Sequence, residues 1–215
     1  IRDQPRSRGL GDVYKRQVIV VDMQNAFCTD EGSIAKIGLD ISMLKAAVEP
    51  CKRLISAART AEIPIIFTRY IFRPDYADGG IMVKYLIPAL GESGHLTAGT
   101  PDIEVVDALA PQKDDYIVDK NRPSSFYATG LEPMLNGLGV DSLVVCGVTT
   151  NCCVETTVRD ASQRDYKTFV VTDATGELEQ ERHDFAINTM EFLFAETVTV
   201  DDMVQLWQSK QSSAA

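Results

Sequence analysis

The stretch CGVTTNCCVETTVRD, residues 146–160, decides the fold prediction, because an apolar strand runs here into a turn and then into a helix. The turn places the thiol of Cys153 at the start of that helix. Unpaired backbone N–H groups and the positive end of the helix dipole favour a thiolate there, and the same groups can hold a developing oxyanion. Cys153 is therefore a candidate nucleophile, although most free cysteines are only small buried residues.

β-Branched runs alternate with longer stretches of helical pattern along the rest of the chain, which is typical of βαβ units and a parallel sheet. The predicted strands are residues 18–22, 63–69, 116–119, 142–146, 168–172 and 197–200. The predicted helices are residues 41–61, 104–109, 131–138, 153–164, 179–194 and 201–208. The pattern predicts an α/β fold of three layers, in which helices cover both faces of a six-stranded, mainly parallel sheet.

Two charged residues, Asp22 and Lys120, close other predicted strands. Taken singly, Asp22 has a plainer explanation as a helix N-cap or turn former, and Lys120 as a solvated surface cation. Parallel strands gather their carboxyl ends along one edge of the sheet, and open α/β sheets place their sites outside that edge. Asp22, Lys120 and Cys153 are therefore expected to converge there, although they lie far apart in the sequence.

Three motifs resemble the isochorismatase-like cysteine hydrolase superfamily, whose members include nicotinamidases, N-carbamoylsarcosine amidase, and ureidoacrylate and biuret amidohydrolases. They are VVDMQNAF at residues 20–27, DKNRPSSF at 119–126 and the run from Gly147 to Arg159. The resemblance extends from about Val18 to Trp207 and implies a Rossmann-like sheet with strand order 3-2-1-4-5-6. The family pattern Gly-Val-x-Thr-Asn-x-Cys-Val-Glu-x-Thr places the nucleophile at Cys153 and leaves Cys152 in a variable slot.

The residue types of this triad suit hydrolysis of an amide. Asp22 can accept the thiol proton and later deliver it to the leaving nitrogen, and Lys120 can supply positive charge that favours the thiolate. Cys153 would attack a carbonyl carbon, with the oxyanion held by the backbone N–H groups of Thr149 and Cys153. The resemblance also implies a cis peptide bond between Val148 and Thr149 at this turn.

Several residues near the motifs are predicted to contact a substrate. Asn side chains supply both donors and acceptors to an amide or urea, and aromatic rings supply flat walls. The predicted substrate-binding residues are Asn25, Phe27, Phe126, Tyr127 and Asn151. Arg69 and Arg73 could hold a substrate carboxylate, or equally pair with surface Asp and Glu. The long segment 70–100 is expected to be a lid over the substrate, a subunit interface, or both.

The histidines argue against a metal site. By resemblance, nicotinamidases hold zinc or a similar ion with an Asp-x-His motif and another His, whereas this chain has only His95 and His183, without partners at ligand spacing. We therefore expect no metal and no other cofactor, and we expect His183 to be a helix surface residue.

Composition fits one globular domain, residues 18–208, in a chain of 215 residues with 45% hydrophobic content. Residues 1–17 are expected to be a disordered or non-native extension, and residues 209–215 a flexible tail. The formal charge of −10 argues against nucleic acid or an anionic membrane as partner and favours a small neutral or cationic substrate.

The location and assembly of the protein are expectations of the same kind. The five cysteines show no disulfide framework, and no apolar stretch is long enough to span a membrane, which together predict a cytoplasmic enzyme with reduced thiols. The resemblance implies a homodimer or homotetramer.

The predicted function is hydrolysis of a linear C–N bond in a small ureido or N-carbamoyl amide, such as biuret, triuret or a ureidoacrylate-like compound, through a thioester and with release of ammonia. Isochorismatases use the same fold to cleave a vinyl ether without a nucleophilic Cys, so this reaction is the alternative enzyme activity. Another alternative is a catalytically silent member whose fold serves binding or assembly, and the complete triad argues against it. A third alternative is redox sensing by the pair Cys152 and Cys153.

Overall fold

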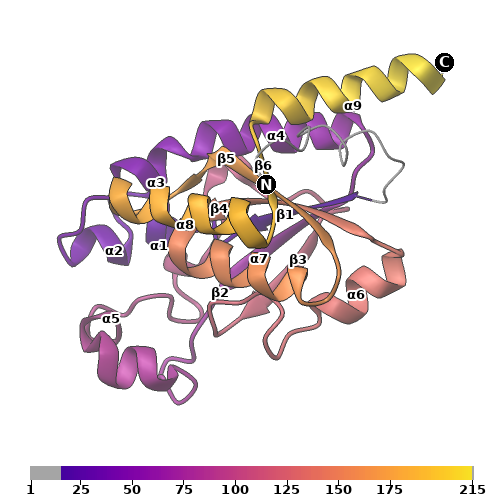
Figure 1. Cartoon of the computed structure of the whole chain (residues 1–215). Helices are drawn as coiled ribbons and strands as arrows, with labels where there is room; N and C mark the ends of the chain where they lie inside the picture. The colour runs from indigo at the N-terminus through magenta and orange to yellow at the C-terminus, as the bar shows by residue number, and fades with distance from the viewer. Residues whose placement is uncertain (1–15, 215) are drawn as a thin grey trace.

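A computed structural model describes the backbone of residues 16–214 and the side chains of residues 16–209. Its centre is one sheet of six parallel strands in the order β3-β2-β1-β4-β5-β6 (Figure 1). The strands are β1 (Arg16–Val21), β2 (Ile65–Tyr70), β3 (Tyr116–Lys120), β4 (Ser142–Val148), β5 (Lys167–Gly176) and β6 (Glu196–Val198). The predicted strand order and parallel arrangement are confirmed.

The two central strands, β1 and β4, are buried along their whole length because their apolar side chains face helices on both sides. Gly147 lies beside Val21 in the register of these strands, with φ of +114°. A Cβ atom at this position would lie 2.1 Å from the Val21 carbonyl oxygen, so only glycine allows the strands to approach here. The pairing of β4 with β5 shifts between Val145 and Gly147, where the chain turns toward the carboxyl edge.

Helices cover the two faces of the sheet (Figure 1). One face carries α3 (Ser42–Ala46), α4 (Val48–Thr60) and α9 (Val200–Ala214), and the other carries α6 (Leu131–Leu138), α7 (Glu155–Ser162) and α8 (Gln180–Leu193). The helix α4 buries Cys51, Leu54, Ile55 and Ala58, whose spacing forms one apolar stripe. None of the helices in the described residues has the length and apolar character needed to cross a membrane.

Short elements surround the carboxyl edge of the sheet. They are α1 (Asn25–Cys28), α2 (Ser33–Lys36), α5 (Pro88–Glu92), two π-helical turns, η1 (Met82–Leu86) and η4 (Thr150–Val154), and two 3₁₀ turns, η2 (Pro101–Ile103) and η3 (Asp107–Leu109). The segment 70–100 contains η1 and α5, and it exposes several large apolar side chains. These are Ile81, Tyr85, Leu86 and Ile87.

Some predicted boundaries are wrong. The predicted helix 104–109 is only the short turn η3, because Val105 extends the chain to form a bridge with Gln24. The predicted helix 41–61 is divided into α3 and α4 at Ala47. The strand β1 begins at residue 16, so the last two residues of the predicted 1–17 extension belong to the sheet, while residues 1–15 lie outside the described part. The helix α9 continues to Ala214 through most of the predicted tail, and residue 215 is also outside the described part.

Candidate functional site

Asp22, Lys120 and Cys153 meet at the carboxyl edge of the sheet. Asp22 follows β1, Lys120 is the last residue of β3, and Cys153 lies in η4 after β4. The Lys120 Nζ atom is 2.6 Å from Asp22 Oδ2 and 3.4 Å from Cys153 Sγ. All three residues are buried. One ammonium group thus contacts both a carboxylate and a thiol in a site shielded from water.

The backbone and β2 both hold Asp22 in place. Its φ of +50° is in the left-handed region, which an Asp adopts more readily than most residues. Thr68 Oγ1 donates a hydrogen bond of 2.7 Å to Asp22 Oδ1, and the Asp22 N–H donates one of 3.2 Å to Thr68 Oγ1. Asp22 Oδ2 accepts no hydrogen bond of regular geometry from the described residues, despite the short contact with Lys120. This oxygen therefore retains an acceptor position for a proton.

The ammonium group of Lys120 is held on several sides. Besides Asp22 and Cys153, its Nζ donates to the Arg122 carbonyl oxygen at 3.1 Å and lies 4.0 Å from the centroid of the Tyr70 ring. Burial acts to lower the pKa of Lys120, but the negative charge of Asp22 and the contact with Cys153 outweigh it and raise the pKa. Lys120 therefore carries its positive charge at neutral pH.

The thiol of Cys153 differs from the expectation of a resting thiolate. A hydrogen bond with the Cys152 thiol and burial raise the pKa of Cys153 well above that of a free thiol, and the charge of Asp22 acts in the same direction. Lys120 opposes these effects without reversing them, because its charge is already balanced by Asp22. Burial and Cys152 therefore oppose ionisation of the Cys153 thiol, and Lys120 favours it.

The turn before Cys153 exposes amide groups next to the sulfur. The peptide bond between Val148 and Thr149 is cis. The Thr149 carbonyl oxygen accepts hydrogen bonds from the N–H groups of Cys152 at 3.2 Å and Val154 at 3.1 Å. Among the backbone hydrogen bonds outside helices and strands in residues 16–214, none is donated by the N–H groups of Thr149 or Cys153. Their role as an oxyanion hole stays a prediction.

Two further residues, Glu177 and His183, contact this turn, and Glu177 was not among the predicted site residues. The buried Glu177 accepts a hydrogen bond of 2.9 Å from the Asn151 N–H through its Oε2 atom. His183 Nδ1 lies 2.9 Å from Thr150 Oγ1, and burial lowers the pKa of His183. His183 lies on the helix α8, as predicted, but it is half-buried against the nucleophile turn instead of fully exposed. Glu177 could have been found, because it is a charged residue directly after β5, as Asp22 is after β1.

The predicted substrate-binding residues do not form one group. Asn25 donates to the Pro101 carbonyl oxygen at 2.9 Å, and Phe27 is buried against the ring of His95. Phe126 is buried and lies against Tyr166 and the guanidinium of Arg164. Tyr127 and Asn151 are both exposed to solvent. Asn25, Phe27 and Phe126 thus contact other residues of the chain, and their role in binding a substrate stays a prediction.

The two arginines proposed as carboxylate ligands are both paired with acids of this chain. Arg69 Nε lies 2.8 Å from Asp119 Oδ1, and Arg69 Nη1 lies 3.6 Å from Glu104 Oε2. Arg73 Nε lies 3.2 Å from Asp75 Oδ1. Of the two interpretations that the sequence left open, the structure shows pairing with Asp and Glu.

The described residues contain no group of three or more His, Cys, Asp or Glu side chains placed to hold a metal ion. His95 is buried, and its Nδ1 lies 2.5 Å from Ser33 Oγ, which itself donates to Asp102 Oδ2 at 2.6 Å. Burial lowers the pKa of His95 to about 4, although Asp102 acts in the opposite direction. This cluster connects the segment 70–100 to α2.

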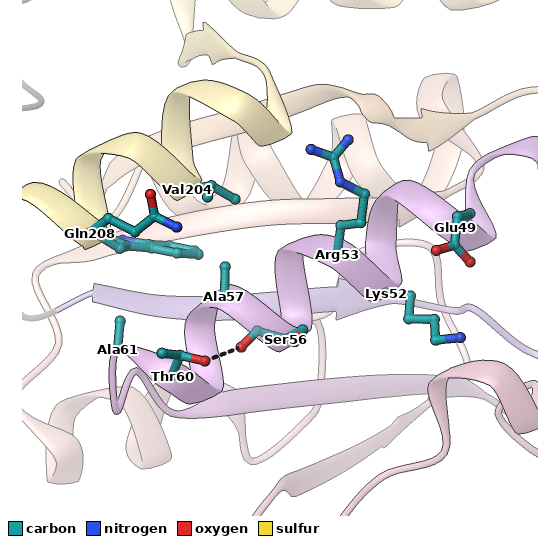
Figure 2. A pocket seen from close by; sticks show the side chains of 10 residues that line it. Glu49, Lys52, Arg53, Ser56, Ala57, Thr60, Ala61, Val204 and Gln208 are labelled. Carbon is teal, nitrogen blue, oxygen red and sulfur yellow. Dashed lines mark hydrogen bonds between the residues drawn. The ribbon is translucent and has the colours of Figure 1, made fainter.

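A groove of about 440 Å³ lies between α4 and α9, on a face of the sheet and away from the triad (Figure 2). Arg53 and Lys52 extend from α4 along the groove, and Val204 and Gln208 approach it from α9. No residue of the triad lines this groove, so its size does not make it the candidate active site.

Comparison with known proteins agrees with the geometry. The sequence model of the isochorismatase domain matches residues 16–202. The chain belongs to the isochorismatase family. Within this family, a ureidoacrylate amidohydrolase RutB from Methylorubrum extorquens is 37% identical over 170 residues, which cover 74% of this chain and 68% of the relative. Another from Azorhizobium caulinodans is 34% identical over 202 residues, which cover 88% of this chain and 89% of the relative.

Solved structures confirm the isochorismatase-like fold. A cysteine hydrolase from Pseudomonas syringae pv. phaseolicola 1448A superposes with a TM-score of 0.86 and 33% identity, covering 96% of this chain and 99% of the other. The N-carbamoylsarcosine amidase from Thermoplasma acidophilum superposes with a TM-score of 0.70 and 26% identity, covering 86% and 96%. The resemblance inferred from the three motifs is confirmed.

Proposed function

We propose that this isochorismatase-family protein is a cysteine amidohydrolase that hydrolyses the linear C–N bond of a small ureido or N-carbamoyl amide, through a thioester and with release of ammonia. Its enzyme class is hydrolase acting on carbon–nitrogen bonds other than peptide bonds, the class of the amidohydrolases that it resembles. The substrate is therefore a small-molecule amide.

The observation that carries the proposal is the position of Lys120. Its Nζ atom contacts Asp22 Oδ2 at 2.6 Å and Cys153 Sγ at 3.4 Å in one buried cluster. A silent protein kept only for assembly would not need a buried carboxylate, ammonium and thiol together, because buried charges are costly unless function retains them. A vinyl-ether hydrolase would not need the thiol.

The first half of the reaction forms the thioester. The thiol proton of Cys153 passes to Asp22 as the sulfur attacks the carbonyl carbon, so the neutral resting thiol needs no separate ionisation. Lys120 stabilises the negative charge that the sulfur gains. The N–H groups of Thr149 and Cys153 hold the oxyanion of the tetrahedral intermediate. The C–N bond then breaks, and Asp22 returns the proton to the leaving nitrogen, which departs as ammonia.

The second half regenerates the enzyme. Asp22 accepts a proton from a water molecule, and the resulting hydroxide attacks the thioester carbon, which is a thiocarbamate carbon when the substrate is a ureido compound. The C–S bond breaks, and the proton held by Asp22 passes to the Cys153 sulfur. The neutral thiol and the carboxylate are restored, with one water consumed and one ammonia released.

We also propose that the segment 70–100 covers the substrate and that its apolar surface contacts a second copy of the chain. The Tyr70 ring beneath Lys120 and the hydrogen bond from Arg122 to the Asp78 carbonyl oxygen place this segment next to the triad. The side chains of Tyr85 and Leu86 are 76% and 62% exposed, which is more than expected for such large apolar groups in an isolated subunit.

A substrate panel tests the proposal. Ammonia release is measured with biuret, triuret, N-carbamoyl amino acids, ureidoacrylate, nicotinamide and simple amides, and isochorismate turnover is measured separately. Cys153→Ala should abolish ammonia release, whereas the matched variant Cys152→Ala should retain it, because Cys152 is not placed against Lys120 Nζ as Cys153 is. Isochorismate turnover that survives in Cys153→Ala, with no ammonia from any compound, would instead establish the vinyl-ether hydrolase.

A further inference from the structure

The side chain of Thr68 contacts Asp22, the candidate general acid and base, from the neighbouring strand. The strands β1 and β2 are parallel partners in which Val20 lies beside Phe67, so Thr68 lies beside the end of β1, where Asp22 follows. The Thr68 hydroxyl donates a hydrogen bond of 2.7 Å to Asp22 Oδ1 and accepts one of 3.2 Å from the Asp22 N–H. Both residues are 0% exposed. One buried hydroxyl thus holds the backbone and the carboxylate of Asp22 at the same time.

The two oxygens of the Asp22 carboxylate lie in different surroundings. Oδ1 accepts the hydrogen bond from Thr68, whereas Oδ2 lies 2.6 Å from Lys120 Nζ, the atom that is also 3.4 Å from Cys153 Sγ. Within residues 16–209 the Thr68 hydroxyl has no other hydrogen-bond partner, so it cannot turn away from Oδ1 without leaving a buried donor unpaired. The orientation of the carboxylate is therefore fixed from the side opposite to Lys120.

The hydrogen bond from Thr68 distinguishes the two oxygens as proton acceptors. A protonated carboxyl oxygen accepts a weaker hydrogen bond than a carboxylate oxygen, so a proton on Oδ1 would weaken the buried bond from Thr68. A proton on Oδ2 leaves that bond in place. Lys120 opposes protonation of Asp22 in the resting site, but during attack the negative charge moves from Asp22 to the sulfur, where the same ammonium group stabilises it.

We infer that Thr68 is a positioning residue for the general acid and base, whose hydroxyl occupies Asp22 Oδ1 and directs the thiol proton of Cys153 to Asp22 Oδ2. This role rests on the proposed function, because it assigns the oxygen through which Asp22 exchanges protons in both half-reactions. The proton moves from the sulfur to Oδ2 and then to the leaving nitrogen, and later from water to Oδ2 and back to the sulfur. The Thr68 hydroxyl keeps its own proton throughout.

The experiment compares Thr68→Val, which keeps the shape of the side chain without the hydroxyl, with Thr68→Ser, which keeps the hydroxyl. Thr68→Val should lower kcat for ammonia release by about 10- to 100-fold and leave KM within about threefold, because proton transfer is impaired and substrate binding is not. The acidic limb of kcat/KM should move toward neutral pH by about 1 to 2 pH units, because the ionised carboxylate loses a charge-assisted hydrogen bond. Thr68→Ser should recover most of the rate and the position of the limb.

The matched control is Thr168→Val at the amino end of β5, where another buried threonine hydroxyl donates to the Tyr166 carbonyl oxygen at 3.1 Å. It should change neither kcat nor the pH profile. The role of Thr68 is overturned if Thr68→Val keeps kcat and the acidic limb, if it raises KM alone, or if Thr68→Ser is as slow as Thr68→Val. Thr68→Ala, which also lacks the hydroxyl, replaces Thr68→Val if that variant does not fold.

Urea unfolding tests the contact between Thr68 and Asp22 without any substrate. Thr68→Val should lower the urea midpoint at pH 7, and the loss should be smaller in Asp22→Asn protein, because an amide oxygen accepts a weaker hydrogen bond than a carboxylate oxygen. Equal losses in the two backgrounds would also overturn the role of Thr68. Failure of the proposed function is recognised separately, as the absence of ammonia release from the unchanged protein, and the unfolding comparison then decides whether Thr68 holds the carboxylate.

Discussion

The buried ion pair of Asp22 and Lys120 is expected to add little to the free energy of unfolding, or to lower it. Removing only one partner of the pair is expected to destabilise the fold strongly. Lys120→Met should lower the free energy of unfolding by about 3 to 5 kcal/mol, because it leaves the Asp22 carboxylate buried without a counter-charge. The double variant Asp22→Asn/Lys120→Met should unfold within about 2 kcal/mol of the unchanged protein, or be more stable. It should also be inactive.

The magnitudes follow from the geometry. Both side chains are 0% exposed, and their charges lie 2.6 Å apart. At an effective dielectric constant of about 20, two unit charges at this distance attract by about 6 kcal/mol. Removing two ions from water costs several kcal/mol for each, so attraction and desolvation nearly cancel while the two residues stay strongly coupled.

Urea unfolding at pH 7, followed by far-UV circular dichroism, measures the four corners of this cycle. The matched control is the exposed pair of Lys45 and Asp30, which has the same chemistry at 2.8 Å with side chains 45% and 72% exposed. Its coupling should stay below about 1 kcal/mol. The reasoning is refuted if Lys120→Met costs no more than Lys45→Met, or if the buried double variant loses the sum of its single variants.

Three further outcomes are expected. Because the Cys152 hydrogen bond and burial raise the pKa of Cys153, iodoacetamide should alkylate Cys153 slowly at pH 7 and faster toward pH 9. The substitution Cys152→Ala should speed alkylation of Cys153 at pH 7. Peptide mass spectrometry that shows fast, pH-independent labelling of Cys153 would contradict this expectation. The pKa of His95 is lowered to about 4 from an ordinary 6.5, so the unfolded chain binds more protons than the folded protein between these pH values. Acidification from pH 7 to pH 4 should therefore lower the free energy of unfolding by about 3 kcal/mol. The variant His95→Gln should lack this loss when its urea unfolding is measured at the same two pH values. Glu177→Gln should lower the free energy of unfolding by about 1 to 3 kcal/mol, since one of two backbone N–H groups loses its acceptor, whereas the exposed Glu179→Gln should change it by less than about 0.5 kcal/mol.

The sheet and the meeting of the triad could be predicted because both depend on local patterns. A strand buried on both faces requires a continuous apolar run, as in residues 18–21, and a charged residue at its end is a conspicuous signal. The parallel arrangement then brings Asp22, Lys120 and Cys153 to one edge without any knowledge of packing.

The contacts around the triad could not be predicted because they depend on register and helix rotation. Thr68 reaches Asp22 only through the pairing of β1 with β2, and Arg69 faces Asp119 only because these residues are partners in the pairing of β2 with β3. His183 contacts η4 because of how α8 is rotated, which its weak apolar pattern does not reveal. The protonation state of Cys153 depends on burial and on Cys152, which no motif encodes.

The identity of the nucleophile is tested most directly by trapping the covalent intermediate. Turnover of a substrate that releases ammonia is stopped with acid within one reaction cycle, and the peptides that contain Cys152 and Cys153 are mapped by mass spectrometry. One acyl or carbamoyl adduct is expected on Cys153, with none on Cys152 and no adduct in Cys153→Ala. Steady turnover by Cys153→Ala, or an adduct on Cys152, would contradict it.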